Sequence, residues 1–287
     1  MWLADHIFLD QVELSIQGGD ERFALKDSYA RDTPALYRGI ENCSGLYPEL
    51  EIPAANLTQL LYGEPFEVHH SDGEMAYGRS LCDGYVGWIH RAALEANWQP
   101  PSHMVSASLA PLYKSPHLKQ TPLMMLPMGA MVNATGTVKN GYIELECGRW
   151  SFAKHLAAEP RGDMSLVDIA KLFIGTPYVW GGRTAMGIDC SGLVQMALAL
   201  GGVRCHRDSD MQYKTLGAAI DRGALEAGDL AFFPGHVGIM LDGDNLLHAN
   251  ATHMAVTIDP LEHVIKWVAK DTDKEPFLGG KRISTPQ

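Results

Sequence analysis

A cysteine at the predicted start of a helix constrains this chain more than any other feature. A glycine-rich segment, residues 175–188, leads into Asp189 and Cys190. Asp189 is a good N-cap, because its carboxylate accepts hydrogen bonds from the N–H groups of the first helical turn. Apolar residues then recur at helical spacing up to Leu200, and Gly201-Gly202 follow. The pattern predicts a helix that begins at Cys190 and ends before the two glycines.

The position of Cys190 indicates chemistry as well as structure. A thiol at a helix N-terminus lies at the positive end of the helix dipole, which favours the thiolate and lowers the thiol pKa. Buried cysteines also occur simply as small apolar residues. Here, however, polar and flexible residues surround the thiol, and His236 and His248 follow it. We therefore expect Cys190 to be a nucleophile that a nearby base activates.

The two histidines lie on neighbouring predicted strands, 236–241 and 246–250, which a turn at 242–245 joins. His236 shares a strand face with Gly238, and the glycine leaves room for a neighbouring chain. A hairpin of this size can bring His236 and His248 side by side. One imidazole can then orient the other through a hydrogen bond. Three further histidines in this region are set aside as candidate bases: His206, His253 and His263.

From about Arg31 to residue 158 the chain consists of short predicted strands broken by Gly, Pro, Asn and Asp, which is typical of small β-barrels. Residues 1 to about 30 could form strands or an N-terminal arm. The pattern occurs twice, and this weak internal repeat predicts two similar all-β units. The correspondences are Leu60-Leu-Tyr-Gly63 with Leu126-Pro-Met-Gly129, and the spacing of Trp88 and Leu94 with that of Trp150 and Leu156.

Two linkers divide the chain. Gln99-Pro-Pro-Ser102 cannot continue a strand ladder, and 158–163 is rich in Pro, Gly and charge. Three domains are expected: 1–99, with an N-terminal arm and a first barrel; 103–158, a second barrel; and 163–287. In the last, helices come first and antiparallel strands after, which predicts the α+β class.

Composition excludes several functions. The net charge of −11 argues against binding nucleic acid through a basic surface. The five cysteines are odd in number and form no CxxC pair, so neither a disulfide scaffold nor a structural zinc site is expected.

No apolar run in the chain has membrane-spanning length. The first ten residues lack the pattern of a signal peptide. We expect a cytoplasmic protein, or a periplasmic or secreted one if a leader has been removed.

Six motifs in the last domain resemble the NlpC/P60 family of cell-wall cysteine peptidases, and the likeness covers about residues 163–279. The two β units resemble bacterial SH3-type domains that accompany cell-wall hydrolases. The six motifs are Thr176-Pro-Tyr-Val-Trp-Gly-Gly182, Asp189-Cys-Ser-Gly-Leu-Val194, Arg207-Asp-Ser-Asp-Met-Gln212, Ala227-Gly-Asp-Leu230, His236-Val-Gly-Ile239 and His248-Ala249.

The resemblance implies a papain-like catalytic core, preceded by two SH3-like barrels, with a Cys-His-His triad and neither metal nor other cofactor. Cys190 would be the nucleophile, His236 the general base and acid, and His248 the residue that orients His236. Tyr178 matches a tyrosine that contacts the substrate or the oxyanion. The backbone N–H of Cys190, at the helix start, is a natural oxyanion donor.

The order of domains is similar to that of γ-D-glutamyl-L-diamino-acid endopeptidases, which act on murein stem peptides, L-Ala-γ-D-Glu-diamino acid. In these relatives the first SH3-type domain closes a pocket around a free N-terminal L-Ala. Asp189 and Ser191 match positions that contact its ammonium. We expect Tyr85 to form an aromatic wall of this pocket, with Tyr77 as the second candidate. Such specificity fits the recycling or turnover of wall peptides.

Three alternatives remain open at this point. The chain could be another thiol-dependent amidase or acyltransferase on the same core, or a non-catalytic wall-binding protein. One cysteine with two histidines could also hold zinc. The intact set of Cys190, His236 and His248 favours the peptidase.

Overall fold

The computed structural model describes residues 20–30, 34–50, 55–96, 98–159 and 163–283 of the 287-residue chain. The chain forms two compact units, residues 1–160 and 161–287. The predicted arm up to residue 19 and the middle of the second linker, 160–162, lie outside the described residues. Within the described part, no helix is both long enough and apolar enough to cross a membrane.

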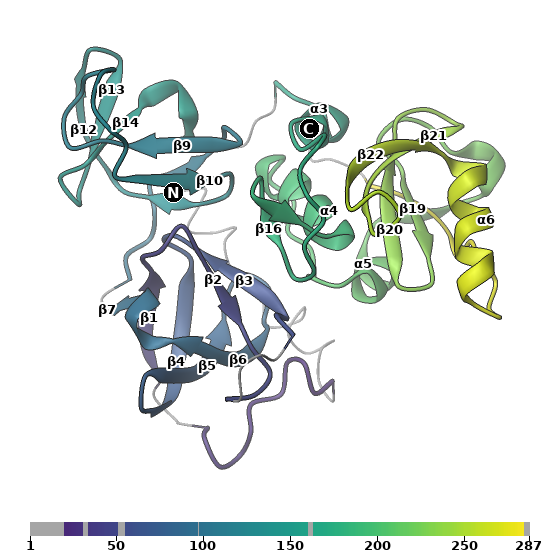
Figure 1. The fold of residues 1–287 in the computed structure, drawn as a ribbon, viewed down its shortest axis with the longest axis horizontal. Helices are drawn as coiled ribbons and strands as arrows, with labels where there is room; N and C mark the ends of the chain where they lie inside the picture. Colours follow the sequence, from purple (N-terminus) through teal and green to yellow (C-terminus); the bar gives the residue numbers. More distant parts are fainter. Residues whose placement is uncertain (1–19, 31–33, 51–54, 97, 160–162, 284–287) are drawn as a thin grey trace. The chain divides into compact units, whose positions relative to one another are not determined.

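The first half of unit 1 is built of antiparallel strands (Figure 1). Five of them form a sheet in the order β6-β5-β4-β1-β7, and β2 pairs with β3. The strands are β1 (Ala35–Gly39), β2 (Cys43–Leu46), β3 (Thr58–Leu61), β4 (Pro65–Asp72), β5 (Met75–Ser80), β6 (Val86–His90) and β7 (Leu94–Ala96), with a short 3-10 helix, η1 (Arg91–Ala93), before β7.

The second half of unit 1 contains three small antiparallel sheets, in the orders β10-β9, β11-β8-β15 and β12-β13-β14. The strands are β8 (His103–Val105), β9 (Leu109–Leu112), β10 (Met124–Pro127), β11 (Met131–Val132), β12 (Ala134–Lys139), β13 (Tyr142–Leu145), β14 (Trp150–Phe152) and β15 (Leu156–Ala157), with the 3-10 helix η2 (Ala153–His155) before β15.

The predicted repeat is visible in the backbone. In each half, a strand with a tryptophan leads into a 3-10 helix and then a short strand that begins at leucine, Leu94 or Leu156. Each tryptophan also forms an isolated antiparallel bridge to a tyrosine, Trp88 with Tyr47 and Trp150 with Tyr113. Two similar β units therefore follow each other. That each unit closes into a barrel stays a prediction.

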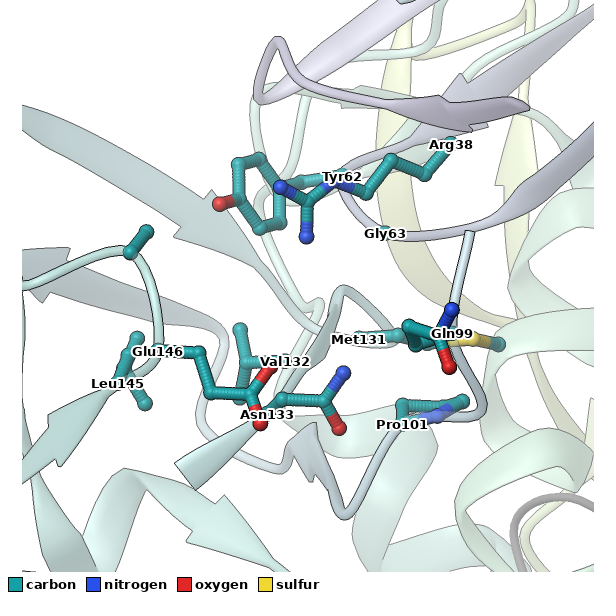
Figure 2. Close-up of a pocket in the computed structure, with 11 residues that line it drawn as sticks. Arg38, Tyr62, Gly63, Gln99, Pro101, Met131, Val132, Asn133, Leu145 and Glu146 are labelled. Atoms are coloured by element: carbon teal, nitrogen blue, oxygen red, sulfur yellow. The ribbon is translucent and has the colours of Figure 1, made fainter. Parts of the chain in front are cut away.

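The two β segments of unit 1 pack directly against each other at Gly63. The Met131 N–H donates to the Tyr62 carbonyl at 2.8 Å, and the Trp98 indole N–H donates to the Gly63 carbonyl at 3.0 Å. Figure 2 shows the small pocket beside this contact, with Arg38 and Tyr62 on one side and Glu146 on the other. Gly63 has a φ of +80°, and a Cβ there would lie 2.0 Å from the Met131 carbonyl oxygen.

Gly63→Ala is therefore expected to destabilise unit 1 by about 1–3 kcal/mol, because the methyl group has no room and the left-handed φ is strained. Gly73→Ala is the matched control, since Gly73 also has a positive φ, +56°, but a Cβ there would meet nothing within 4 Å. Urea unfolding followed by circular dichroism measures both. Equal losses would show that the close approach at Met131 does not matter.

Unit 2 contains a six-stranded antiparallel sheet in the order β18-β23-β19-β20-β21-β22 and a two-stranded ribbon, β16-β17. Its elements are α3 (Leu166–Lys171), β16 (Arg183–Thr184), β17 (Gly187–Ile188), α4 (Cys190–Leu200), α5 (Ser209–Thr215), β18 (Ala218–Ile220), η3 (Arg222–Ala224), β19 (Leu230–Phe233), β20 (His236–Met240), β21 (Asn245–Asn250), β22 (Ala255–Pro260), α6 (Leu261–Asp271) and β23 (Gly279–Arg282).

The sheet of unit 2 carries helices that the sequence pattern largely predicted. Helix α4 packs against α3 and against β20 and β21, and α6 lies alongside β22 (Figure 1). Ser165 and Asp168 form the predicted capping box at the start of α3. Helix α4 begins at Cys190 and ends at Leu200, before Gly201, as predicted. The mixture of helices and antiparallel strands agrees with the predicted α+β class.

The segment 204–212 is polar in sequence, which favours a loop, but the structure makes it partly helical and partly buried. It contains the start of α5, and Arg207 and Gln212 are buried. The Gln212 amide donates to the Ser191 carbonyl at 3.0 Å and to the His206 carbonyl at 2.9 Å. Two carbonyl groups thus satisfy the buried amide nitrogen of Gln212.

Candidate active site

Cys190 is the first residue of α4, and Asp189 is its N-cap. The Asp189 carboxylate accepts from the Gly192 N–H at 2.7 Å. The thiol is nearly enclosed, since Cys190 is 7% exposed. The backbone N–H groups of Val237 and Ser191 lie near enough to the thiol to favour its anionic form. Because Val237 directly follows His236 in β20, the thiol lies beside the strand that carries the predicted base.

The expected low pKa of Cys190 is wrong for the substrate-free structure. Burial, followed by the nearby charge of Asp189, raises the pKa of the thiol to about 12. The N–H groups of Val237 and Ser191 and the Arg207 charge act in the opposite direction but are outweighed. A helix dipole contributes a fraction of the free energy that complete desolvation of an anion costs. The Cys190 thiol is therefore neutral at pH 7, and a neutral thiol needs a base if it is to act as a nucleophile.

This protonation state predicts slow alkylation of Cys190. At pH 7 iodoacetamide is expected to label the exposed Cys147 faster than the buried Cys190. Because the folded pKa is raised, the thiolate fraction of Cys190 grows as pH rises toward that pKa, and its labelling should accelerate across the alkaline range. Peptide mass spectrometry after timed labelling measures both rates. Faster labelling of Cys190 at mildly acidic pH would instead indicate a preformed thiolate.

The two predicted histidines lie side by side. His236 Nε2 is 2.8 Å from His248 Nδ1. In the register of β20 and β21, Ile239 lies opposite Leu247, so the two histidines are diagonal neighbours. A Cβ on Gly238 would lie 3.1 Å from the His248 Cβ. The missing side chain at Gly238 thus leaves room for Leu246 and His248 of the neighbouring strand, as the sequence predicted.

The first of these histidines is neutral in the resting site. Burial, and then the neighbouring His248, lower the pKa of His236 to about 3. A neutral imidazole can accept a proton, which is what a general base beside a protonated thiol requires. The Cys190 thiol and the His236 imidazole are therefore both uncharged.

Asp189 takes part in a buried ion pair that the sequence pattern did not reveal. Its partner is Arg207, 1% exposed, whose two terminal nitrogens donate to the carboxylate at 2.8 and 2.6 Å. The Gly181 N–H adds a contact at 2.8 Å. Together with Gly192, these donors occupy the four strong acceptor positions of a carboxylate. The predicted contact of Asp189 with a substrate ammonium stays a prediction. The carboxylate already accepts hydrogen bonds from these four donors within the protein.

Ser191 belongs to the same network, because its hydroxyl accepts from Arg207 at 2.9 Å. Tyr178 is half-buried, and its pKa is raised by burial and by the charges of Cys190 and Asp189. Its phenol group therefore lies close enough to both for their charges to matter. This places Tyr178 at the predicted nucleophile, while its contact with substrate stays a prediction.

Tyr85 and Tyr77 lie in the aromatic packing of unit 1. Tyr85 is 2% exposed, and its ring meets the edge of Phe23 at a centroid distance of 5.1 Å. Tyr77 packs against Tyr29 and Trp88. The described part of the N-terminal arm is thus bound to the β-sheet through these rings. A substrate contact of Tyr85 stays a prediction, and the structure adds a packing role for it.

The sequence pattern also did not reveal Asp259, on β22. Its carboxylate oxygen Oδ2 lies 3.1 Å from His248 Nε2. The alternation of side chains along β22, the strand after the hairpin, could have revealed it. Asp259 shares a sheet face with Thr257, and Thr257 pairs with His248.

Comparison with known proteins places these observations in a family. Residues 175–271, which include the cysteine and both histidines, match the NlpC/P60 family model. Residues 46–94 match the model of the bacterial dipeptidyl-peptidase SH3 domain. The chain carries an NlpC/P60 domain preceded by a bacterial SH3 domain. This confirms the predicted family, and NlpC/P60 relatives indicate a cysteine-type peptidase.

Two curated relatives resemble most of the chain. It is 28% identical to dipeptidyl-peptidase 6 of Lysinibacillus sphaericus, over 76% of this chain and 89% of that protein. It is also 28% identical to the γ-D-glutamyl-L-lysine dipeptidyl-peptidase of Bacillus subtilis, over 72% of this chain and 77% of that protein. An NlpC/P60 family protein from Bacillus cereus has the same fold, with a TM-score of 0.73 at 21% identity, over 88% of this chain and all of that structure.

Proposed function

We propose that this protein is a cysteine endopeptidase that hydrolyses the bond between D-Glu and the diamino acid in murein stem peptides. The observation that carries the proposal is the cysteine at the start of α4, which lies beside the strand that carries His236, together with the contact of His236 with His248. The names of two relatives, γ-D-glutamyl-L-lysine dipeptidyl-peptidases from Bacillus subtilis and Bacillus cereus, support the substrate class.

The geometry supports a two-step acyl transfer. In the first step the Cys190 sulfur attacks the γ-carbonyl carbon of D-Glu, and His236 accepts the thiol proton. The Cys190 N–H, at the open end of α4, is positioned to donate to the oxyanion that forms. His236 then gives the proton to the departing amine of the diamino acid. In the second step water, deprotonated by His236, attacks the thioester carbonyl, the C–S bond breaks, and His236 returns the proton to the Cys190 sulfur.

The finer proposal is a preference for peptides with a free N-terminal L-Ala. It rests on the order of domains shared with the dipeptidyl-peptidases, whose names describe removal of a dipeptide from an end. Such an enzyme acts on peptides already released from muramic acid, so we place it in the recycling or turnover of wall peptides, in the cytoplasm. The experiment below determines whether the third residue of the preferred stem peptide is diaminopimelate or lysine.

The test compares kcat/KM for L-Ala-γ-D-Glu-diaminopimelate, for its lysine counterpart and for both after N-acetylation, with products identified by mass spectrometry. We expect L-Ala-D-Glu and the free diamino acid as products, and a loss on acetylation of at least about 100-fold, because acetylation removes the ammonium charge and adds bulk where the proposed site recognises a free amine. Equal cleavage of free and acetylated peptides would refute the finer proposal. Transfer to an added amine without hydrolysis would identify an acyltransferase instead.

A further inference from the structure

The hydrogen-bonded row that begins at His236 continues beyond His248 to Asp259. His248 is 1% exposed, and its Nε2 lies 3.1 Å from Asp259 Oδ2. The pairing of β21 with β22 places Thr257 opposite His248 and Asp259 opposite Leu246. Asp259 is therefore a diagonal neighbour of His248 on one face of the sheet, as His248 is of His236. Three adjacent strands each contribute one member of the row.

Other groups hold the Asp259 carboxylate in place. The Thr257 hydroxyl donates to Oδ2 at 2.6 Å, and the Asn250 amide donates to that hydroxyl at 2.8 Å. On the more exposed side, His253 Nε2 lies 3.2 Å from Oδ1. Burial alone would raise the pKa of Asp259, but hydrogen bonds from Thr257 and His248 lower it below its ordinary value. The group is therefore a carboxylate at neutral pH.

The chemistry of this row fixes where the protons lie. A carboxylate only accepts hydrogen bonds, so His248 Nε2 carries a proton. Burial lowers the pKa of His248, so its ring is neutral and Nδ1 is an acceptor. The contact between the rings then requires His236 Nε2 to be the donor. Consequently the unprotonated nitrogen of His236 is Nδ1.

We propose that Asp259 is a positioning residue that sets the tautomers of His248 and, through it, of His236, so that Nδ1 of His236 is free to take the Cys190 proton. This role rests on the proposed function. During attack the S–H bond breaks and an Nδ1–H bond forms on His236. The resulting imidazolium keeps its Nε2–H bond to His248, and the fixed carboxylate at the end of the row favours the positive charge.

Two other readings of this cluster fit less well. Within the described part of the chain, no three His, Cys, Asp or Glu side chains are arranged to hold a metal ion. A purely structural role in joining β21 to β22 is already served by the backbone ladder from Asn245 to Asn250. Neither reading explains why the Thr257 hydroxyl, which accepts from Asn250, donates to the same Asp259 oxygen that faces His248.

The experiment uses Asp259→Leu, which removes the acceptor, and Asp259→Asn, which keeps an acceptor oxygen but removes the charge. The Thr257 hydroxyl orients the amide of Asp259→Asn with its oxygen toward His248. On L-Ala-γ-D-Glu-diaminopimelate we expect Asp259→Leu to lose about 10–100-fold in kcat with a smaller change in KM, since residues that orient a catalytic imidazole act at this scale. Asp259→Asn should recover most of that loss. His253→Gln replaces the imidazole at Oδ1 and its contact with the Trp267 ring but leaves Oδ2 and its donors in place, so this matched control should stay within a few-fold of the wild type.

The second readout needs no substrate. Nitrogen NMR of imidazoles in full-length Cys190→Ala protein distinguishes the two neutral tautomers, with His236 and His248 assigned by substitution. We expect His248 and His236 both protonated at Nε2 in Cys190→Ala alone and with Asp259→Asn, and mixed tautomers with Asp259→Leu. Protonation of His248 at Nδ1 in Cys190→Ala alone, or unchanged tautomers and activity with Asp259→Leu, would overturn the proposal. If the wild type does not cleave the peptide, the proposed function fails, while the NMR result still decides the role of Asp259.

Discussion

Replacing Cys190 by alanine is expected to lower kcat on the γ-D-glutamyl tripeptide by about 10,000-fold or more, because removal of a nucleophile abolishes covalent catalysis and leaves only binding and oxyanion stabilisation. The fold should persist. The side chain is small, and the helix start is held by the Asp189 carboxylate, which accepts from the Gly192 N–H at 2.7 Å. Peptide turnover is followed by liquid chromatography, with circular dichroism as the check on folding.

Cys205→Ala is the matched control for this loss. Cys205 is the other buried cysteine of the described residues, in the same unit, and its sulfur lies 3.6 Å from the Gln212 amide nitrogen. Its removal deletes a buried thiol without deleting the proposed nucleophile, so kcat should remain within a few-fold of the wild type. Retained turnover in Cys190→Ala, or a comparable loss in Cys205→Ala, would contradict the assignment of the nucleophile.

Arg207→Ala is expected to destabilise unit 2 by about 3–5 kcal/mol, because breaking a buried ion pair leaves the other charge uncompensated. The guanidinium is 1% exposed and also donates to the Gly182 carbonyl at 3.2 Å and to the Ser191 hydroxyl at 2.9 Å. It therefore ties the glycine-rich loop to the first turn of α4. Urea unfolding, followed by circular dichroism and by loss of activity, gives the change in the free energy of unfolding.

Two variants make this measurement specific. Arg222→Ala removes an exposed ion pair with Glu262, and such a pair contributes at most about 1 kcal/mol. Combining Arg207→Met with Asp189→Asn removes both charges, and the double variant should be less destabilised than the sum of the single ones, because neither charge is left alone. A loss in Arg207→Ala no larger than that in Arg222→Ala would show that the buried pair does not hold the helix start.

Local patterns predicted the parts of the site that lie within one element or one hairpin. The N-cap at Asp189, the start of α4 at Cys190 and the stop at Gly201 follow from capping and helical periodicity. The meeting of His236 and His248 follows from strand alternation and the space at Gly238. These features depend on neighbours in sequence, which a single chain reveals.

Features that depend on packing were not predictable in the same way. Arg207 reaches Asp189 from a segment that reads as a polar loop, and only the fold shows that the pair is buried. Asp259 contacts His248 from the next strand of the sheet. The raised pKa of Cys190 depends on how completely the thiol is desolvated, and the sequence reveals only the opposing helix dipole.

Hydrolysis of L-Ala-γ-D-Glu-diaminopimelate in heavy-oxygen water tests the central claim most directly. Attack of Cys190 on the γ-carbonyl, followed by hydrolysis of the thioester, places one heavy oxygen atom in the new γ-carboxylate of D-Glu and none in the diamino acid. Tandem mass spectrometry of the two products locates the label. We predict label only in the γ-carboxylate of L-Ala-D-Glu, with no reaction by Cys190→Ala protein. Label in the α-carboxyl of L-Ala, or labelled products from Cys190→Ala, would contradict the assignment of the bond or of the nucleophile.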